Sequence, residues 1–450
     1  MSDHGEPDFS PLKEINNVTT FPPPQEVSIE KILNNGAGLA RTGEGQVVFV
    51  NGALDGERYH IKAWHKRRGS LWAHEATRLS DSPQRTAPDC PSANHCGGCQ
   101  LRHVRAENEA AIKAAFFSDT CGRIGKWSVS ETEITAFPRP HSRYRGKFQV
   151  NGGKLGFHEA GSNRIAPIRT CDVLPASVFD ALPRLVKITQ DTAFKGFIFY
   201  ACSPDEKNPC FLFEGRAEKP KKVLSLIQRS GLPVARIGWR AGGNSSKQWL
   251  PTPTLTMRWC DWRVTLETDQ FFQTNPASWP RFWDQVRAYQ QQVQPRLIWD
   301  VHAGSGFLSA ALRGIGDTCN LVLSEPDPRA ITNLKRNLTN HNGVTVVHGT
   351  AEDVIKQGSL AEQPVDGLIL DPPRVGLSDI LIDWIATARP ASLLAFSCDS
   401  GTFARDLKKL RAAGYEPRGA AEIMDVVPGS LRFESVLTLV DSRNSRFRLT

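Results

Sequence analysis

The residue with the most informative surroundings is Cys398, which follows an apolar run and precedes residues that begin helices. Residues 393–396 are typical of a strand buried in a parallel sheet, and Asp399 or Ser400 can accept a hydrogen bond from a free N–H of the next helix. The pattern therefore places the thiol at the carboxyl edge of a sheet, where ligands bind in open α/β folds. A buried structural cysteine is the alternative, because free cysteine is among the most buried residue types.

A second set of thiols comes early in the chain, where Cys90, Cys96 and Cys99 are separated by short stretches rich in proline and glycine. These turns let three sulfur atoms converge on one centre, and Cys121 and Cys171 are candidates for a fourth ligand. Zinc and iron–sulfur clusters both use four thiolates, but a triplet with a remote fourth cysteine favours a cubane iron–sulfur cluster. The alternative is a loop with three structural cysteines.

A strand, a glycine turn and a helix are predicted in the last third of the chain. The strand over 297–301 runs into Ala303-Gly304-Ser305-Gly306, and glycines let the backbone approach a ligand closely. The next strand, over 321–324, ends in Glu325, about twenty residues after the turn, where an acid can bind ribose hydroxyls. This pair predicts a ligand that contains adenosine.

Further strands bring more polar groups to the same edge. The strand over 367–370 is followed by Asp371-Pro372-Pro373-Arg374, and the next strand ends at Cys398. Strands and helices alternate from 296 to about 412, which is the pattern of a doubly wound sheet. A helix over 279–292 precedes it.

The first part of the chain differs in pattern. Residues 1–25 are polar and contain prolines, which predicts a disordered lead. Short strands broken by Gly, Asn and Asp over 26–79 predict a small β-barrel. Basic residues beside aromatic rings, such as Lys62, Lys66 and Trp72, suit RNA binding, with a solvated basic face as the alternative.

Between barrel and glycine turn, the sequence predicts a helix over 107–123 and then broken strands, including one over 259–262. We expect a mostly β central domain there. The predicted domains are a lead over 1–25, a barrel over 26–85, a central domain over 86–262 and a catalytic domain over 263–450, with the helix over 107–123 packing against the last.

Composition limits the classes of protein that the chain can be. Its 450 residues are too many for one ordinary core, so two or three domains are expected. A net charge of +8 makes a polyanion a plausible partner. No apolar run approaches the ~20 residues of a membrane span. The first residues have no signal-peptide pattern, and most cysteines are isolated, so we expect a cytoplasmic protein without a membrane partner.

Five segments together resemble a known family. Asp-Val-His-Ala-Gly-Ser-Gly at 300–306, Glu325, Asp-Pro-Pro-Arg at 371–374, Ser397-Cys398 and Phe-Glu-Ser-Val at 433–436 are similar, in order and spacing, to the motifs of S-adenosylmethionine-dependent RNA uracil-5-methyltransferases. The resemblance extends over nearly the whole chain. It implies an α/β architecture: a Rossmann-like class I methyltransferase domain, an N-terminal OB-like TRAM barrel, and a mostly β central domain with a [4Fe-4S] loop.

The resemblance also implies roles for particular residues. Cys398 would add to carbon 6 of uracil, and Glu434 would remove the proton from carbon 5 after methyl transfer. Contacts to S-adenosylmethionine are implied for Gln273, His302, Gly304, Gly306, Phe307, Glu325, Thr350 and Asp371. The implied ligands of the [4Fe-4S] cluster are Cys90, Cys96, Cys99 and Cys171.

The substrate implied by the resemblance is 23S rRNA, because the bacterial tRNA branch of the family typically lacks both the barrel and the cluster cysteines. Methylation of tRNA is one alternative, and a non-catalytic RNA-binding or ribosome-assembly factor with structural zinc is another. A monomer is expected. Near the substrate, Asp399-Ser400 and Arg432 depart from the family pattern, as His302 and Phe307 do near the methyl donor.

Overall fold

The computed structural model describes residues 25–67, 69–129, 131–242, 247–260, 262–312, 319–338, 342–358, 360 and 364–444. The predicted disordered lead over 1–25 lies outside these residues except for Gln25. Within them, the chain forms a closed barrel, a seven-stranded sheet, an eight-stranded sheet and a two-stranded ribbon. None of the helices in these ranges is long and apolar enough to cross a membrane.

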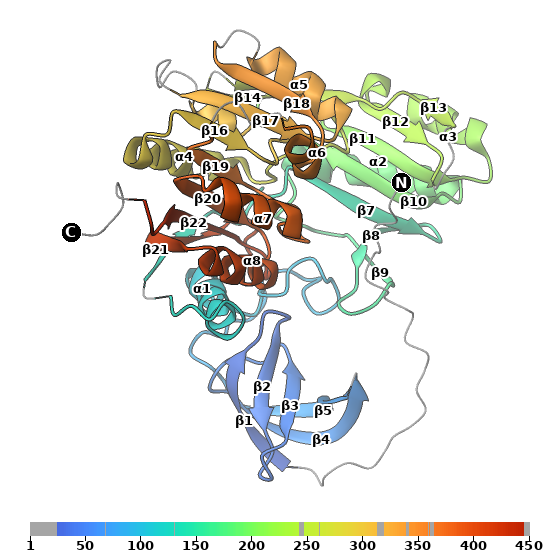
Figure 1. Ribbon diagram of the computed structural model, residues 1–450. Helices are drawn as coiled ribbons and strands as arrows, with labels where there is room; N and C mark the ends of the chain where they lie inside the picture. The colour runs from blue at the N-terminus through green and yellow to red at the C-terminus, as the bar shows by residue number, and fades with distance from the viewer. Residues whose placement is uncertain are drawn as a thin grey trace.

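The barrel lies at one end of the molecule (Figure 1). Its strands are β1 (Gln25–Ile32), β2 (Ala37–Arg41), β3 (Val47–Asn51), β4 (Arg58–Arg67) and β5 (Ser70–Ser80), in the closed order β1-β2-β3-β5-β4. Alternate residues point inward and form a small apolar core. A Cβ atom on Gly38 would lie 2.8 Å from side-chain carbons of both Ala53 and Ile29, so only glycine fits there. The predicted barrel is confirmed.

The seven-stranded sheet has the order β13-β12-β11-β10-β7-β8-β9. Its elements are β7 (Arg145–Asn151), β8 (Lys154–His158), β9 (Ile165–Pro167), α2 (Ala176–Asp191), β10 (Lys195–Ala201), β11 (Cys210–Arg216), α3 (Pro220–Arg229), η1 (Val234–Arg236), β12 (Ile237–Arg240) and β13 (Gln248–Leu250). Apolar residues of α2 and α3 share one core with alternate residues of the strands. These two helices were missed in the sequence; Pro183 lies inside α2, and Pro220 begins α3.

The eight-stranded sheet has the order β18-β17-β16-β19-β20-β22-β21-β6. Its elements are α1 (Ala106–Arg123), β6 (Thr132–Ala136), η2 (Pro276–Ser278), α4 (Trp279–Val293), β16 (Leu297–Asp300), η3 (Ser309–Leu312), β17 (Asn320–Glu325), α5 (Pro328–Leu338), β18 (Val344–His348), α6 (Ala351–Lys356), β19 (Gly367–Leu370), α7 (Asp379–Ala388), β20 (Ser392–Ser397), α8 (Ser400–Ala412), β21 (Tyr415–Asp425) and β22 (Glu434–Asp441). The first five strands of this order run parallel, and β22 runs antiparallel to both its neighbours.

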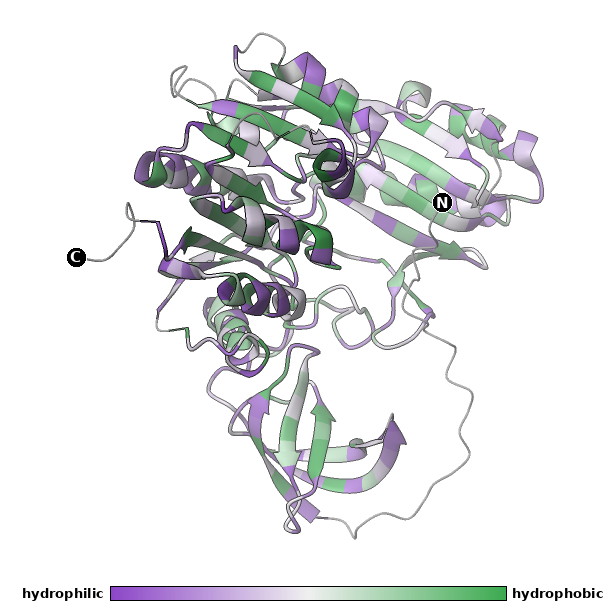
Figure 2. Cartoon of the chain, viewed as in Figure 1, coloured by the Kyte–Doolittle hydropathy of each residue, from purple (hydrophilic) through white to green (hydrophobic). Residues whose placement is uncertain are grey.

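Helices cover both faces of this sheet. Leu393 of β20 belongs to the core beneath α1, α7 and α8, whereas the next residue, Leu394, belongs to the core beneath α4 and α5. Strands buried on both faces read as continuous apolar runs, which is why the sequence predicted them. Figure 2 shows these strands as hydrophobic and the outer helix surfaces as hydrophilic. The predicted doubly wound fold is confirmed.

Segments assigned by sequence to the central domain contribute to both sheets. Helix α1 packs against α8 and β21, and β6 pairs in parallel with β21; Figure 1 shows α1 beside α8 despite their distance in the chain. The strand predicted over 259–262 is wrong. Trp259 ends β14 (Thr254–Trp259) and pairs with Trp262, which begins β15 (Trp262–Glu267), and Cys260 lies between them at a φ of 50°, so this is a turn. Asp261 lies outside the described residues.

Candidate active site

Three adjacent strands bring Asp371, Cys398 and Glu434 to one edge of the eight-stranded sheet. Asp371 follows β19 and Cys398 follows β20, and these two strands are parallel neighbours. Because β22 runs antiparallel to β20, its first residue, Glu434, lies at the end of β20, and Ser397 pairs with Ser435. We call these three side chains the acidic edge.

Each group of the acidic edge is disfavoured as an anion. Burial raises the pKa of Glu434 well above its usual range, and the charge of Asp371 adds to this rise. Burial likewise raises the pKa of Asp371 to about 6. The pKa of Cys398 rises to about 12 through burial and then through the charges of Glu434 and Asp371, which the exposed Arg374 only partly opposes. A cationic ligand would therefore stabilise this site.

Side chains around Cys398 fix the turn from β20 into α8. The N–H of Thr402 donates to Asp399 Oδ1 at 2.9 Å, which makes Asp399 the N-cap of the helix. The N–H of Asp399 donates to Ser397 Oγ at 3.2 Å. Asn could cap the same helix, so Asp399, one of the departures from the family pattern, preserves the local structure.

The loop after Asp371 is tied to α8. Asp406 Oδ2 accepts from the N–H of Leu377 at 2.8 Å, and Arg405 donates to the carbonyl of Val375 at 2.7 Å. Gly376 has a φ of 80°, and a Cβ there would lie 2.3 Å from both Arg405 and Asp406 side-chain atoms. Helix α8 thus positions the loop after Asp371 as well as Asp399, its own N-cap.

The glycine turn is held by Glu325 at the end of β17. Glu325 Oε2 accepts from the N–H of Gly304 at 2.9 Å, and Oε1 accepts from the N–H of Asp327 at 2.9 Å. Gly304 has a φ of 53°, and no atom lies within 4 Å of where its Cβ would be. The turn therefore presents open space beside an oriented carboxylate.

Two buried polar atoms near this turn have no hydrogen-bond partner among the described residues. They are Asp300 Oδ1 and His302 Nδ1. Ser309 Oγ donates to the other carboxyl oxygen of Asp300 at 2.5 Å, and burial raises the Asp300 pKa to about 7. Burial lowers the pKa of His302 to about 4, so the ring is neutral at pH 7. Unpaired buried polar atoms at an open turn fit a polar ligand. Asp300 was quoted in the motif but not assigned a role.

Several implied donor contacts have other partners here. Phe307 packs its ring in an aromatic cluster, and a Cβ on Gly306 would meet Leu334 at 2.9 Å. The aromatic partners of Phe307 are Trp262, Trp279, Phe282 and Trp283. Thr350 is the N-cap of α6, in a capping box with Asp353. Gln273 is buried, and its carbonyl accepts from Trp279 Nε1 at 3.0 Å. The roles implied for these residues remain predictions.

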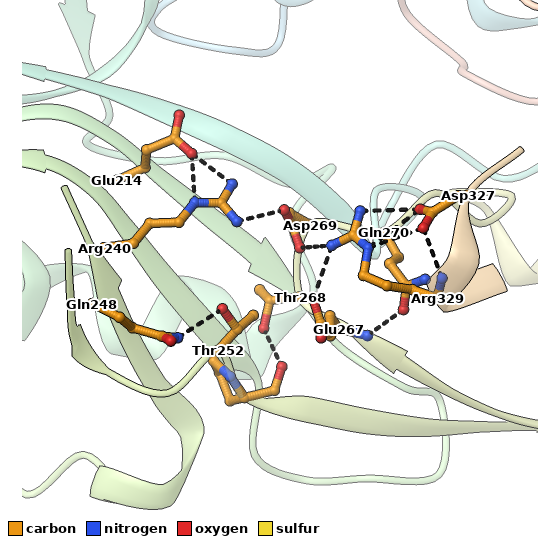
Figure 3. Close-up of polar contacts among 11 residues, drawn as sticks. Glu214, Arg240, Gln248, Thr252, Glu267, Thr268, Asp269, Gln270, Asp327 and Arg329 are labelled. Atoms are coloured by element: carbon orange, nitrogen blue, oxygen red, sulfur yellow. Dashed lines mark hydrogen bonds and ion pairs between the residues drawn. The ribbon is translucent and has the colours of Figure 1, made fainter. Parts of the chain in front are cut away.

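An ion-pair network connects the seven-stranded sheet to the glycine turn (Figure 3). Asp269 contacts Arg240 of β12 at 2.9 Å and Arg329 of α5 at 3.3 Å. Arg329 also pairs with Asp327 at 3.1 Å, and the backbone N–H of Asp327 is one of the two donors to Glu325. The network thus ends at the carboxylate that orients the turn.

Cys90, Cys96, Cys99 and Cys171 line one cavity with mostly apolar walls, and we call it the cysteine pocket. Cys121, the alternative fourth ligand, is instead buried in the core beneath α1. No three His, Cys, Asp or Glu side chains in the described ranges are arranged to hold a metal ion. Four thiols that line one cavity are a donor set that a [4Fe-4S] cluster or zinc could use.

Two arginines each lie over an aromatic ring, one near Gln273, where no role was predicted, and one in the basic face predicted on the barrel. Arg145, at the start of β7, lies over the ring of Phe271 with 5.0 Å from Cζ to the ring centroid, and its buried Nε has no partner in the described structure. Phe271 is 62% exposed and precedes Gln273 by two residues. On the barrel, Arg67 lies over Trp72 at 5.7 Å. In the sequence, the only signal for Arg145 was a basic residue near the start of a predicted strand.

Comparison with known proteins defines the family relationship. Residues 24–74 match the TRAM domain. The chain is 25% identical to an uncharacterized RNA methyltransferase of Halalkalibacterium halodurans, over 92% of this chain and 96% of that protein. It is 27% identical to the 23S rRNA (uracil(1939)-C(5))-methyltransferase of Chromohalobacter salexigens, over 92% and 88%. The chain is thus a relative of the RNA methyltransferases. The predicted resemblance and enzyme class are confirmed.

The fold of this methyltransferase has a solved counterpart. The tRNA (uracil-54, C5)-methyltransferase of Pyrococcus abyssi, in complex with S-adenosyl-L-homocysteine, has a TM-score of 0.70 at 19% identity, over 92% of this chain and 99% of that chain. The match includes barrel, seven-stranded sheet and eight-stranded sheet together, since it leaves out only a small part of either chain. S-adenosylmethionine is therefore supported as the methyl donor.

Proposed function

We propose that this protein methylates carbon 5 of a specific uridine in 23S rRNA, with Cys398 as nucleophile and Glu434 as base. The observation that carries the proposal is the position of one thiol and one carboxyl on adjacent strand ends, beside a glycine turn. Two further findings support the proposal: the match to the TRAM domain, and the 23S rRNA methyltransferase among the relatives.

The proposed chemistry uses two members of the acidic edge, Cys398 and Glu434. Carbon 5 of uracil is a weak nucleophile, and addition of the Cys398 thiolate to carbon 6 makes it an enolate carbon. S-adenosylmethionine supplies an electrophilic methyl group on a positively charged sulfur. Glu434 then takes the proton from carbon 5, and the electron pair of that C–H bond restores the C5–C6 double bond and expels the thiolate.

Binding of the positively charged donor would also help Cys398 to ionise. The free site disfavours the thiolate, because it is buried next to two carboxyl groups. A positive charge near these groups lowers the energy of every anion in the site. We infer that donor binding precedes thiolate addition. Residues that would hold the donor are Gln273, His302, Gly304, Gly306, Phe307, Glu325, Thr350 and Asp371, together with Asp300.

The target uridine must leave its stack to reach the strand edge, at a cost of a few kcal/mol. Contacts of the barrel and of Arg145 and Phe271 with RNA would offset this cost. The four thiols of the cysteine pocket would hold a [4Fe-4S] cluster, whose role would be to join separate chain segments.

Mapping of 5-methyluridine in ribosomal and transfer RNA from strains with and without the gene tests the proposal. Loss of one 5-methyluridine from 23S rRNA is expected. Loss from tRNA alone would favour the activity named for the Pyrococcus abyssi enzyme. Unchanged RNA, and no transfer of labelled methyl groups by the purified protein, would favour a non-catalytic RNA-binding factor.

A further inference from the structure

Residues 426–433 connect β21 to β22 and end next to Glu434, so their position determines where the carboxyl of that residue lies. In the middle of this connection, the N–H of Gly429 donates to Oε2 of Glu109 at 2.6 Å. Glu109 belongs to α1 and is only 2% exposed. A carboxylate that accepts from a buried N–H forms one of the stronger hydrogen bonds in a protein.

A buried ion pair holds the start of the same connection. Lys113, one turn after Glu109 on α1, pairs with Asp425 and lies 3.3 Å from the carbonyl oxygen of Val427. Both charged side chains are almost completely buried. Removal of either partner would leave an uncompensated charge in the core, which is strongly destabilising. Helix α1 therefore holds the connection at two points.

The cysteine pocket holds the connection from the other side. The residues directly after Cys99 are Gln100 and Leu101. The N–H of Leu101 donates to the carbonyl of Gly429 at 2.9 Å, and Gln100 Oε1 accepts from the N–H of Leu431 at 3.2 Å. A Cβ on Gly429 would lie 3.6 Å from Cβ of Cys99. The pocket and the connection to Glu434 are thus in direct contact.

Two arginines extend this contact to the rest of the pocket. Arg139 pairs with Glu109 and lies 3.4 Å from Asp89, which precedes the first cysteine of the pocket. Arg102 pairs with Asp89 at 2.9 Å and with Asp172, which follows the last cysteine. Arg102 is 3% exposed. One continuous set of ion pairs therefore runs from both ends of the pocket to Glu109.

We propose that Glu109 is a positioning residue for Glu434, and that the cysteine pocket, through this set of ion pairs, determines where the base lies. The inference rests on the proposed function of Cys398 and Glu434. If the contacts of Glu109 and of the cysteine pocket with residues 426–433 were loosened, removal of the carbon 5 proton would slow more than thiolate addition or methyl transfer would. Those earlier steps depend on Cys398 and the glycine turn, which other elements hold.

The chemistry of the last step gives a specific readout. The C5–H bond breaks, its proton goes to the Glu434 carboxylate, its electron pair forms the C5–C6 double bond, and the C6–S bond breaks with its electrons on sulfur. A displaced base leaves methylated RNA attached to Cys398. When fluorine replaces hydrogen on carbon 5, no proton can be removed. An RNA with 5-fluorouridine therefore reports only the steps before the base acts.

The test compares Glu109→Gln with Glu107→Gln, which makes the same change at an exposed position on the same helix. With uridine RNA and S-adenosylmethionine, Glu109→Gln should accumulate the covalent adduct and form product ~10-fold more slowly, the loss expected for one buried charge-assisted hydrogen bond. With 5-fluorouridine RNA, both variants should form adduct at the rate of the unaltered enzyme. Electrophoresis under denaturing conditions measures the adduct.

Gln100→Ala provides a second variant, because Gln100 is exposed and its loss should not prevent folding. It should accumulate adduct in the same way, to a smaller extent. Product formation at the unaltered rate by a folded Glu109→Gln protein, or by Gln100→Ala if Glu109→Gln does not fold, would overturn the inference. Equal slowing with both RNAs would also overturn it. If Glu434→Gln traps no adduct, Glu434 is not the base of the proposed function, and the inference fails with that assignment.

Discussion

The acidic edge and the cysteine pocket differ in whether their buried charged groups have partners of opposite charge. At the acidic edge, Glu434 Oε2 is buried and has no hydrogen-bond partner among the described residues, and the exposed Arg374 partly opposes the raised pKa of Glu434 and of Cys398. Around the cysteine pocket, the buried Arg102 is paired with the more exposed Asp89 and Asp172, although its Nε has no hydrogen-bond partner among the described residues. An unmatched buried acid is costly, whereas a matched pair forms part of a scaffold.

This difference indicates that the acidic edge carries out the chemistry and that the cysteine pocket supports the structure. An edge with unmatched acids gains most from a ligand that brings positive charge, and S-adenosylmethionine is such a ligand. A pocket bounded by matched ion pairs has little to gain from a charged substrate, and its four thiols suit a resident cluster. Substitutions at the edge should therefore change individual reaction steps, while substitutions in the pocket should change folding and positioning.

The largest effect is expected for Cys398→Ala, which removes the nucleophile. Transfer of labelled methyl groups to RNA should fall by at least ~1,000-fold, as is typical when a covalent nucleophile is removed. Cys260→Ser is the matched control, since Cys260 is exposed in the turn between β14 and β15 and should leave transfer unchanged. Substantial activity in Cys398→Ala would place the chemistry elsewhere.

Glu434→Gln should reduce turnover by ~100-fold to ~10,000-fold, the range for loss of a general base. Because thiolate addition and methyl transfer do not need this base, the variant should trap RNA covalently. A gel-stable protein–RNA species that requires S-adenosylmethionine is the expected observation. A low turnover without any adduct would instead assign Glu434 to an earlier step.

Much of the acidic edge was predictable, because its strands are short, apolar and buried on both faces. The runs that became β19 and β20 end in Asp371 and Cys398, so one edge for both residues followed from parallel pairing. The position of Glu434 did not follow from periodicity. It depends on β22 entering antiparallel between β20 and β21, which no local pattern required.

Long-range pairings explain most of what the sequence did not predict. Thr132 of β6 pairs with the distant Ala421 of β21, and α1 packs against α8 and β21. The resemblance implied donor contacts for Thr350 and for Phe307, which departs from the family pattern, yet local capping and aromatic packing give their side chains other contacts. The residue pattern alone left Cys171 and Cys121 open; the resemblance implied Cys171, which lines the cavity.

Cys171→Ser tests the supporting role of the pocket. The variant should lose iron and visible absorbance and should unfold at a temperature several degrees lower, because a bound cluster stabilises only the folded chain. Cys121→Ser is the control: its thiol is buried in a different core, so the protein should keep its iron despite a modest loss of stability. Iron retained in the first variant and lost in the second would reverse the ligand assignment.

The pH dependence of Cys398 tests the electrostatics of the edge. Its raised pKa of about 12 means that the free thiol stays protonated and reacts slowly with iodoacetamide until the solution is strongly alkaline. Asp371→Asn removes a negative charge that disfavours the thiolate, so alkylation of Cys398 should begin at lower pH, by a shift of ~1 unit.

Asp399→Asn is the control for that shift. Asp399 is exposed and its charge has the smallest of the named effects on Cys398, while asparagine preserves the N-cap. The change in pH dependence should therefore be smaller than in Asp371→Asn. Peptide mass spectrometry after timed alkylation measures both. Identical profiles for Asp371→Asn and the unaltered protein would mean that burial alone suppresses the thiolate.

The smallest effect is expected for the ion-pair network in Figure 3. Its charges are paired, as those of Arg102 are at the cysteine pocket, but they lie near the surface. Arg329 is 41% exposed at its side chain, and exposed ion pairs contribute ~0.2–1 kcal/mol. Arg329→Gln should therefore weaken S-adenosylmethionine binding by ~2-fold to ~5-fold, measured by calorimetry, because Asp327 and Glu325 keep their backbone hydrogen bond. Arg411→Gln breaks a similar exposed pair with Glu416 and should leave binding unchanged. A loss above ~100-fold in Arg329→Gln would mean that the glycine turn depends on its distant partners as strongly as the acidic edge depends on its own carboxyl groups.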